Sequence, residues 1–296
     1  MRAKLDAREW AWSGGPYAGL HFAFRVRCDD EAAGGYLASV LDPLASPVDA
    51  PHTYSIVDHG PQRTQRAVVY LDGRRITRAS SVAAAVPHLL WHVNRSTIRE
   101  SGQYLLVHAS AAEAGGRALV FPGAMEAGKT TLVAGLLRRG FRYVTDEVVA
   151  LDLAAHVVVP YPKSLSVDPG SWDVLADLAP RLPGDLAAFS ITQWQVDPRA
   201  VRHDAIAAPC PVALVIAPRY AAGEPTRAEP VSRAVGVRLL AENSFNFADH
   251  GAAGLAVLAA VVRGADCYRL TIGSLDEACD IISGLAGYVG TMSPSL

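Results

Sequence analysis

The sequence predicts a mixed α/β protein in two parts, an N-terminal α+β region over residues 1–100 and a larger α/β domain over residues 101–296. Three observations predict this fold. The second part alternates short apolar segments with helical patterns, which is typical of strands and helices packed in layers. One of its apolar segments leads directly into a glycine-containing loop and then a helix. The 296 residues are enough to bury a large core in one long domain or in two.

The N-terminal region begins with residues 1–50, which the sequence predicts to be irregular apart from one strand over residues 19–26. Alternate positions of that strand are apolar and would face one way. They are Leu20, Phe22, Phe24 and Val26. Residues 66–71 and 74–76 predict a hairpin around an Asp-Gly turn.

A helix is predicted over residues 80–95, with Ser81 as its N-cap and a stripe of apolar residues on one face. Pro87 lies inside this segment. We expect it to bend the helix or to restart it, because proline lacks the N–H that continues the hydrogen-bond ladder.

The second part carries the elements of a mixed sheet with flanking helices. Strands are predicted at residues 105–109, 118–121, 141–145, 148–153, 156–159, 212–217 and 268–272. Helices are predicted at residues 131–139, 169–178, 232–247, 252–263 and after Ser274, where Ser-Leu-Asp-Glu matches a capping box. Residues 180–195 are predicted to form a loop.

Residues 123–130 match the phosphate-binding pattern G-x-x-x-x-G-K-[ST] without a mismatch. Gly123 and Gly128 let the backbone fold around phosphate oxygens, and the loop N–H groups and the helix N-terminus favour negative charge. Lys129 is expected to reach the β- and γ-phosphates of a nucleotide, and Thr130 to hold Mg²⁺. The sequence therefore predicts an ATP·Mg²⁺ site, whose loop residues are Gly123, Ala124, Met125, Glu126, Ala127, Gly128, Lys129, Thr130 and Thr131.

A carboxylate pair, Asp146-Glu147, follows the loop helix and the next predicted strand, unusually close in sequence to the lysine. Two interpretations are open for this pair. The carboxylates either serve the nucleotide site or are strand-end charges that pair with Arg142 or Arg139. His108 follows apolar residues upstream, and it is either a site residue or a core histidine whose ring nitrogens are satisfied.

The order of these features resembles the HPr kinase/phosphorylase family, relatives of phosphoenolpyruvate carboxykinase. The family has a histidine after an apolar strand, a phosphate loop, a helix ending in Arg-Gly (here Arg139-Gly140) and an acidic pair. The resemblance implies that residues 101–296 adopt the phosphate-loop fold of that family and bind ATP and Mg²⁺. It also implies that Asp146 helps to hold the metal, that Glu147 accepts a proton, and that His108 lies near the γ-phosphate.

The chain departs from the family pattern in three places. Residues 125–127 replace serine and glycine in the loop, and Glu126 is expected to point to solvent because an inward carboxylate would repel phosphate. The second member of the acidic pair is Glu147 instead of aspartate. A family segment with a second metal-binding glutamate has no clear counterpart, and residues 161–167 offer the cation Lys163 there instead.

The sequence thus predicts phosphoryl transfer from ATP·Mg²⁺ to a hydroxyl, with Lys163 and Arg219 as candidate cations for the substrate. Divergent HPr-kinase-like proteins found beside peptide natural-product genes look closest to this chain, and that branch implies a serine of a small precursor peptide as the acceptor. Two alternatives stay open, a kinase of a small metabolite (a polyol, sugar or amino acid) and a nucleotide-binding regulatory module. A regulatory module needs no base beside the γ-phosphate, so Glu147 favours a kinase.

Composition excludes several classes of partner. The 27 basic and 29 acidic side chains give a net charge of −2, so no global field attracts nucleic acid or a membrane surface. No apolar stretch is long enough to span a membrane, and the first ten residues lack the apolar core of a signal peptide. The four cysteines are widely spaced and are expected to be reduced, mostly buried thiols of a cytoplasmic protein. The sequence does not indicate the oligomeric state.

Overall fold

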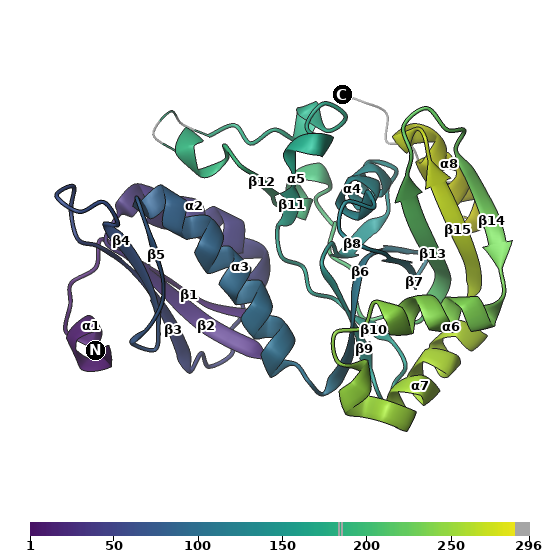
Figure 1. Ribbon diagram of the computed structural model, residues 1–296, viewed down its shortest axis with the longest axis horizontal. Helices are drawn as coiled ribbons and strands as arrows, with labels where there is room; N and C mark the ends of the chain where they lie inside the picture. Colours follow the sequence, from purple (N-terminus) through teal and green to yellow (C-terminus); the bar gives the residue numbers. More distant parts are fainter. Residues whose placement is uncertain (183, 185, 288–296) are drawn as a thin grey trace. The chain divides into compact units, whose positions relative to one another are not determined.

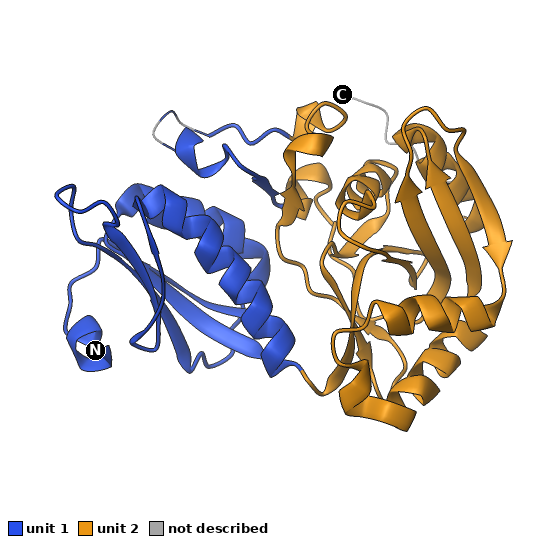
Figure 2. Cartoon of the chain, viewed as in Figure 1, with its two compact units in different colours: residues 1–101, 179–197 blue, residues 102–178, 198–296 orange. Residues whose placement is uncertain are grey.

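The computed structural model describes residues 1–182, 184 and 186–287, and the chain divides into two compact units (Figures 1 and 2). The first unit comprises Met1–Ser101 and Ala179–Asp197, and the second comprises Gly102–Leu178 and the chain from Pro198 onward. The sequence assigned the segment Ala179–Asp197 to the second domain, whereas the structure groups it with the first unit. One reason is the side chain of Phe189 in this segment, which stacks on Tyr36 of the first unit at 4.9 Å between ring centroids.

The first unit is a five-stranded sheet in the order β1-β2-β3-β4-β5. Its strands are β1 (Trp12–Gly19), β2 (Phe22–Cys28), β3 (His52–Asp58), β4 (Ala67–Leu71) and β5 (Arg74–Ala79). Neighbouring strands run antiparallel except β2 and β3, which are parallel. Helices α2 (Glu31–Leu41) and α3 (Val82–Glu100) lie side by side on the sheet (Figure 1). The shorter elements are α1 (Arg2–Asp6), the 3₁₀ turns η1 (Asp42–Leu44) and η4 (Ala187–Phe189), and β12 (Trp194–Val196).

The prediction that residues 1–50 are largely irregular is wrong, because this segment contains β1, β2 and α2. Asp30 caps α2, its side chain accepting a hydrogen bond from the Ala33 N–H at 2.8 Å. The strand expected over residues 19–26 crosses a turn at Leu20, whose φ of 52° separates β1 from β2. Glycine content suggested irregular structure, but strand pairing and burial outweigh the weak intrinsic preference of this segment.

The hairpin and the helix of the first unit are confirmed. Asp72 and Gly73 both have positive φ, as the tight turn between β4 and β5 requires. The Ser81 side chain caps α3 by accepting a hydrogen bond from the Ala84 N–H at 3.1 Å. Pro87 lies inside α3, which continues without a restart to Glu100.

The second unit is a mixed sheet in the order β10-β9-β6-β7-β13-β15-β14, with β8 paired to β6 as well. Its strands are β6 (Tyr104–Ala114), β7 (Arg117–Pro122), β8 (Arg142–Thr145), β9 (Val148–Asp152), β10 (Val158–Val159), β13 (Val212–Tyr220), β14 (Arg227–Val231) and β15 (Asp266–Ile272). The short strand β11 (Leu165–Val167) lies outside this sheet. The three strands β7, β13 and β15 are parallel, and the other pairings of this sheet are antiparallel. The helical elements are α4 (Lys129–Arg138), α5 (Pro198–Val201), α6 (Arg233–Glu242), α7 (Phe247–Arg263), α8 (Leu275–Leu285) and the 3₁₀ turns η2 (Pro169–Ser171) and η3 (Ala176–Leu178).

The two sides of β6 position the candidate site. Alternate residues of β6 enter the apolar core formed with α6 and α7 (Leu105, Val107, Ala109 and Ala111). Since side chains alternate along a strand, His108 and Ser110 face the opposite way, toward α4. The Ser110 hydroxyl donates to the Lys129 backbone oxygen at 3.3 Å, which confirms that orientation.

Most elements predicted for the second unit are present. The helix expected over residues 169–178 is wrong, because only the short turns η2 and η3 form there. The helix expected over residues 232–247 ends early, at Glu242, because Asn243 to Asn246 instead hydrogen-bond to β6. Ser274 is the N-cap of α8 but makes no side-chain capping bond, so the capping box is not formed.

All four cysteines are free and buried, as the sequence predicts. Within the described ranges, no helix combines the length and the apolar character needed to cross a membrane.

Replacing Ser81 tests the cap of α3. We expect Ser81→Ala to lower the free energy of unfolding by about 1 kcal/mol, because the Ala84 N–H loses its partner at the helix start. Ser274→Ala is the matched control, since this N-cap side chain makes no capping bond. Its effect should stay within about 0.5 kcal/mol. Urea unfolding followed by circular dichroism measures both, and equal losses would contradict the assignment.

Candidate functional site

The loop that follows β7 turns tightly into α4. Gly128 is the N-cap of α4 with φ 86° and ψ 13°, a left-handed conformation that side chains disfavour. Glu126 also has positive φ, at 63°. A Cβ atom built on Gly128 would lie 3.7 Å from the Tyr220 Cβ and 4.0 Å from the Ile272 Cδ1. The loop therefore sits at the carboxyl ends of the parallel strands β7, β13 and β15, where α/β sheets bind ligands.

The N-terminus of α4 is open to an anion. Gly128 supplies no side-chain cap, and the first turn contains no acidic residue. Unsatisfied N–H groups and the helix dipole favour negative charge at such an end. Met125 and Glu126 are exposed at the tip of the loop, so Glu126 points to solvent as expected.

Lys129 is buried and its ammonium lies across the loop. Nζ donates to the backbone oxygens of Gly123 at 2.8 Å and of Ala124 at 2.6 Å. Burial lowers the pKa of Lys129, while the charges of Glu147 and Asp146 act against that shift. The lysine is thus held at the loop and lies within electrostatic reach of both carboxylates.

The acidic pair occupies the break between β8 and β9, two strands that pair with β6 one after the other. Thr145 lies opposite Ala111, and Val148 lies opposite His108. The pair therefore faces the segment of β6 that carries His108 and Ser110. This pairing brings together two segments that are separated in sequence by the loop and α4.

Asp146 is 4% exposed and both of its carboxylate oxygens are occupied. Oδ1 accepts a hydrogen bond from the Tyr143 hydroxyl at 2.7 Å and forms an ion pair with Lys163 Nζ at 2.7 Å. Oδ2 accepts from the Ser166 N–H at 2.8 Å. Burial and the adjacent carboxylate raise the pKa of Tyr143 well above its ordinary value, so Tyr143 stays a donor.

Lys163 is a buried counter-ion in this structure. Besides Asp146, its Nζ donates to the Ser164 backbone oxygen and the Ser166 hydroxyl, each at 3.0 Å. The alternative partners considered for the acidic pair are engaged elsewhere, Arg142 with Glu113 and Arg139 with Asp276 and Asp280. As a substrate cation, Lys163 would have to leave Asp146.

Glu147 has the opposite environment to Asp146. It is half-buried, and its carboxylate makes no hydrogen bond or ion pair with the described residues. Burial raises the pKa of Glu147, opposed by the Lys163 and Lys129 charges and reinforced by Asp146 and Asp168. A raised pKa brings a carboxylate closer to the range in which it can accept and release a proton near neutrality.

His108 is half-buried on β6, and its ring packs at 5.7 Å and a 47° tilt against Phe245. Burial and the nearby Lys129 charge lower the pKa of His108, which favours a neutral imidazole. Phe245 is 45% exposed. It lies inside the helix predicted over residues 232–247, but α6 ends at Glu242 and the backbone N–H of Phe245 instead bonds to Leu106.

The remaining residues that the sequence predicted for the site differ in whether their side chains have a hydrogen-bond or ion-pair partner. Thr130 is half-buried and has no side-chain hydrogen bond within the described part of the chain. The Thr131 hydroxyl bonds to the Ser171 hydroxyl at 2.5 Å, which ties α4 to η2. Arg219 is exposed near the end of β13 and pairs with Glu224 at 3.0 Å.

These environments decide which residues fit a magnesium ion. Over the described ranges, no group of three or more His, Cys, Asp and Glu residues is arranged to hold a metal. Magnesium needs only one or two protein ligands when phosphate oxygens and water complete its shell. The hydroxyl of Thr130, which has no side-chain partner among the described residues, fits this requirement. Asp146 fits only through a water molecule or after releasing Lys163.

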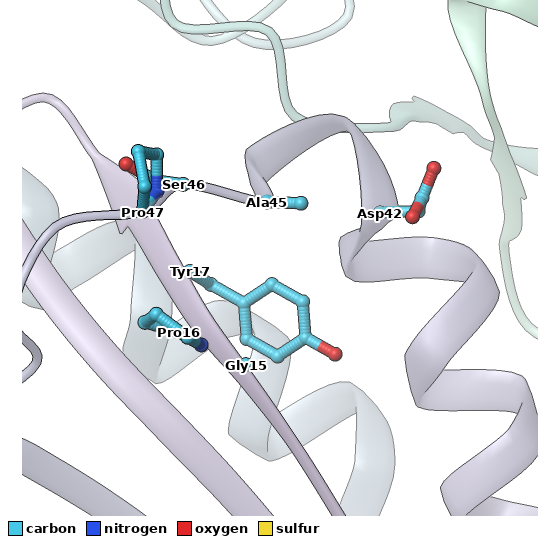
Figure 3. A pocket seen from close by; sticks show the side chains of 7 residues that line it. All are labelled: Gly15, Pro16, Tyr17, Asp42, Ala45, Ser46 and Pro47. Atoms are coloured by element: carbon cyan, nitrogen blue, oxygen red, sulfur yellow. The ribbon is translucent and has the colours of Figure 1, made fainter.

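An open hollow also occurs in the first unit (Figure 3). It is lined by Gly15, Pro16, Tyr17, Asp42, Ala45, Ser46 and Pro47. Burial and the Asp42 charge raise the pKa of Tyr17, and no cation is among the lining residues. This hollow does not fit a phosphate group, and none of the predicted site residues belongs to it.

No protein-family model matches the chain, and no curated protein matches it. Among solved structures, the chain is similar to the HPr(Ser) kinase/phosphatase from Coxiella burnetii at 15% sequence identity, over 62% of this chain and 93% of that one. The TM-score of this match is 0.30.

Removing Lys163 tests the buried ion pair. We expect Lys163→Met to lower the free energy of unfolding by about 3–5 kcal/mol, because Asp146 would keep a buried charge without its counter-ion. Arg238→Met is the control, since it breaks an exposed pair with Glu242 and should cost about 1 kcal/mol or less. Chemical denaturation gives both values. Similar losses from the two variants would show that Lys163 is not a structural counter-ion.

Proposed function

We propose that this protein is an ATP·Mg²⁺-dependent kinase that transfers the γ-phosphoryl group to a hydroxyl, with a serine of a small peptide or protein as the preferred acceptor. The observation that carries this proposal is Glu147. Its carboxylate has a raised pKa, no partner among the described residues, and electrostatic contact with the lysine of the phosphate loop. A module that only binds nucleotide has no need for such a group.

The loop residues bind the nucleotide phosphates in this proposal. The backbone N–H groups of Gly123 to Thr131 and the N-terminus of α4 receive the β- and γ-phosphates. Lys129 exchanges the oxygens of Gly123 and Ala124 for phosphate oxygens. Those two carbonyls return to solvent or water, so the lysine keeps oxygen partners in both states.

In the transfer step, bonds form and break only in the substrates, and the protein positions them. The acceptor oxygen forms a bond to the γ-phosphorus, the bond from that phosphorus to the bridging oxygen of ADP breaks, and Glu147 takes the acceptor proton. Mg²⁺ would neutralise charge that develops on the phosphate oxygens. Thr130 is the protein ligand that fits it without rearrangement, and Asp146 contributes through water while it holds Lys163.

The neutral form of His108 suits an orienting role. A neutral imidazole can donate one hydrogen bond and accept another, so it can hold Glu147 or the acceptor hydroxyl in line with the γ-phosphate. The cations differ in availability. Arg219 is exposed and could exchange Glu224 for a substrate group, whereas Lys163 is committed to Asp146.

The preference for a peptide acceptor rests on the sequence resemblance to HPr-kinase-like proteins of peptide natural-product clusters. Incubation with labelled ATP and panels of serine peptides, polyols, sugars and amino acids tests it. Labelling of a polyol, sugar or amino acid would identify a metabolite kinase instead. Tight ATP binding with no labelled acceptor would identify a regulatory module.

Lys129→Ala tests the nucleotide site. We expect it to abolish transfer and to weaken ATP binding at least tenfold, because the ammonium no longer meets the phosphates. Glu126→Gln is the control, since Glu126 is exposed at the loop tip and should leave affinity nearly unchanged. Calorimetry measures the affinities and circular dichroism checks the fold. Unchanged ATP affinity together with full activity in Lys129→Ala would remove the assignment of the loop.

Glu147→Gln and Asp146→Asn separate the base from the metal. Glutamine keeps the shape of Glu147 but cannot take a proton, so single-turnover transfer should fall by about 10² to 10⁴ with little change in ATP·Mg²⁺ affinity. Asp146→Asn should weaken Mg²⁺ dependence and nucleotide binding together, because it disturbs Lys163 as well as the metal shell. Both are measured at several Mg²⁺ concentrations. Wild-type transfer by Glu147→Gln would rule out the general-base role.

A further inference from the structure

The outer edge of β5 in the first unit is an open strand edge. β5 pairs with β4 and is the last strand in the order of its sheet, within the part of the chain that the structure describes. The backbone N–H and C=O groups on the outer side of an edge strand are available to pair with another extended chain. This edge lies wholly in the first unit and is independent of the phosphate loop.

Three arginines without an ionic partner follow this edge. Arg74, Arg75 and Arg78 are exposed, and their side chains form no ion pair or hydrogen bond with described residues. Arginines elsewhere in the chain commonly meet a carboxylate, as Arg8 does with Asp29 and Arg238 with Glu242. The edge of β5 therefore keeps a concentrated positive charge in a chain whose net charge is −2.

Helix α3 adds to this charge. Arg95 is exposed and its guanidinium lies 5.4 Å from the ring of Trp91, which is 60% exposed. Burial lowers the pKa of His92, and so do the charges of Arg99, Arg95 and Arg74, in that order. The charges of arginines from α3 and from β5 therefore act on the same side chain, His92.

The nearby acidic groups do not neutralise the patch. The Asp72 carboxylate is engaged by His52 Nδ1 at 2.7 Å and by the Thr53 N–H at 2.9 Å. Glu100 pairs with Arg99 at 3.1 Å. Arg74, Arg75, Arg78 and Arg95 form no ion pair with a carboxylate of the part of the chain that the structure describes.

The arginines of β5 lie on both sides of its edge. Arg78 and Arg75 stand opposite Val68 and Tyr70, which pack with Leu5 on one face of the sheet. Arg74 stands opposite Leu71, on the other face. A strand added to β5 would place its side chains alternately on these two faces, and each face offers it an arginine.

We propose that the outer edge of β5, flanked by α3, binds an extended peptide with acidic side chains as an added strand. Open backbone groups supply the main-chain hydrogen bonds of this binding mode, and the arginines supply its specificity for carboxylates, which match the guanidinium fork. A second copy of this chain is a poor occupant, because two β5 edges would set arginine against arginine. A nucleic acid would use the charge but leave the backbone edge unpaired.

The test uses the full chain and a fluorescein-labelled twelve-residue peptide of alternating glutamate and threonine, followed by fluorescence anisotropy. We expect binding that weakens as salt rises, and at least tenfold weaker binding to Arg74→Glu/Arg78→Glu. The matched control is Arg233→Glu/Arg263→Glu, which changes the net charge equally at exposed arginines of the second unit and should bind as the wild type does. Circular dichroism confirms that both variants fold.

Two further probes separate strand addition from simple charge attraction. The same peptide with an N-methyl group on every residue keeps its charge but loses the hydrogen-bond donors of both strand edges, and it should bind at least tenfold more weakly. Oligothymidylate of twelve nucleotides should compete poorly. No binding by the acidic peptide, equal binding by its N-methylated form, or no loss in the Arg74→Glu/Arg78→Glu variant would each overturn the proposal. Stronger binding of the oligonucleotide than of the peptide would assign the surface to nucleic acid.

Discussion

The buried ion pair between Asp146 and Lys163 is the interaction on which the geometry of the candidate site depends. A carboxylate that is 4% exposed is stable there only because an ammonium, a tyrosine hydroxyl and a backbone N–H share its charge. Tyr143 belongs to β8, Ser166 belongs to β11, and Lys163 lies two residues before β11, so these contacts join the end of β8 to the segment that leads into β11. The next residue, Glu147, has no side-chain hydrogen bond or ion pair with the described residues, although the charge of Lys163 acts on it.

The same arrangement gives adjacent carboxylates different chemistry. Asp146 is surrounded by donors and is a structural anion, whereas Glu147 has a pKa raised by burial. Neighbouring acids that are held in different environments are a common way for a protein to separate a permanent charge from a proton acceptor. The difference arises from packing, because the two residues are adjacent in the sequence and are chemically alike.

The sequence predicted the parts of the site that depend on local pattern. The loop, its strand and its helix follow from the order of glycines, lysine and apolar residues, and the structure places them as expected. The partner of Asp146 was not predictable in this way, because Lys163 lies 17 positions further along the chain and reaches it only through the fold. The exposure of Phe245 was not predictable for the same reason, since it depends on where α6 ends and how the next residues pair with β6.

The first unit shows more clearly which elements short stretches of sequence can predict and which they cannot. Glycine and proline in residues 1–50 suggested irregular structure, yet an aspartate cap and an apolar helix face produce α2 there. The hairpin and α3 were predictable because an Asp-Gly turn and a serine cap act over a few residues. Ion pairs were also not predictable from neighbouring residues, because the sequence alone does not show which arginines contact a carboxylate. Arg8 and Arg74 look alike in the sequence, but only the fold brings Asp29 to the first and leaves the second without a carboxylate among the described residues.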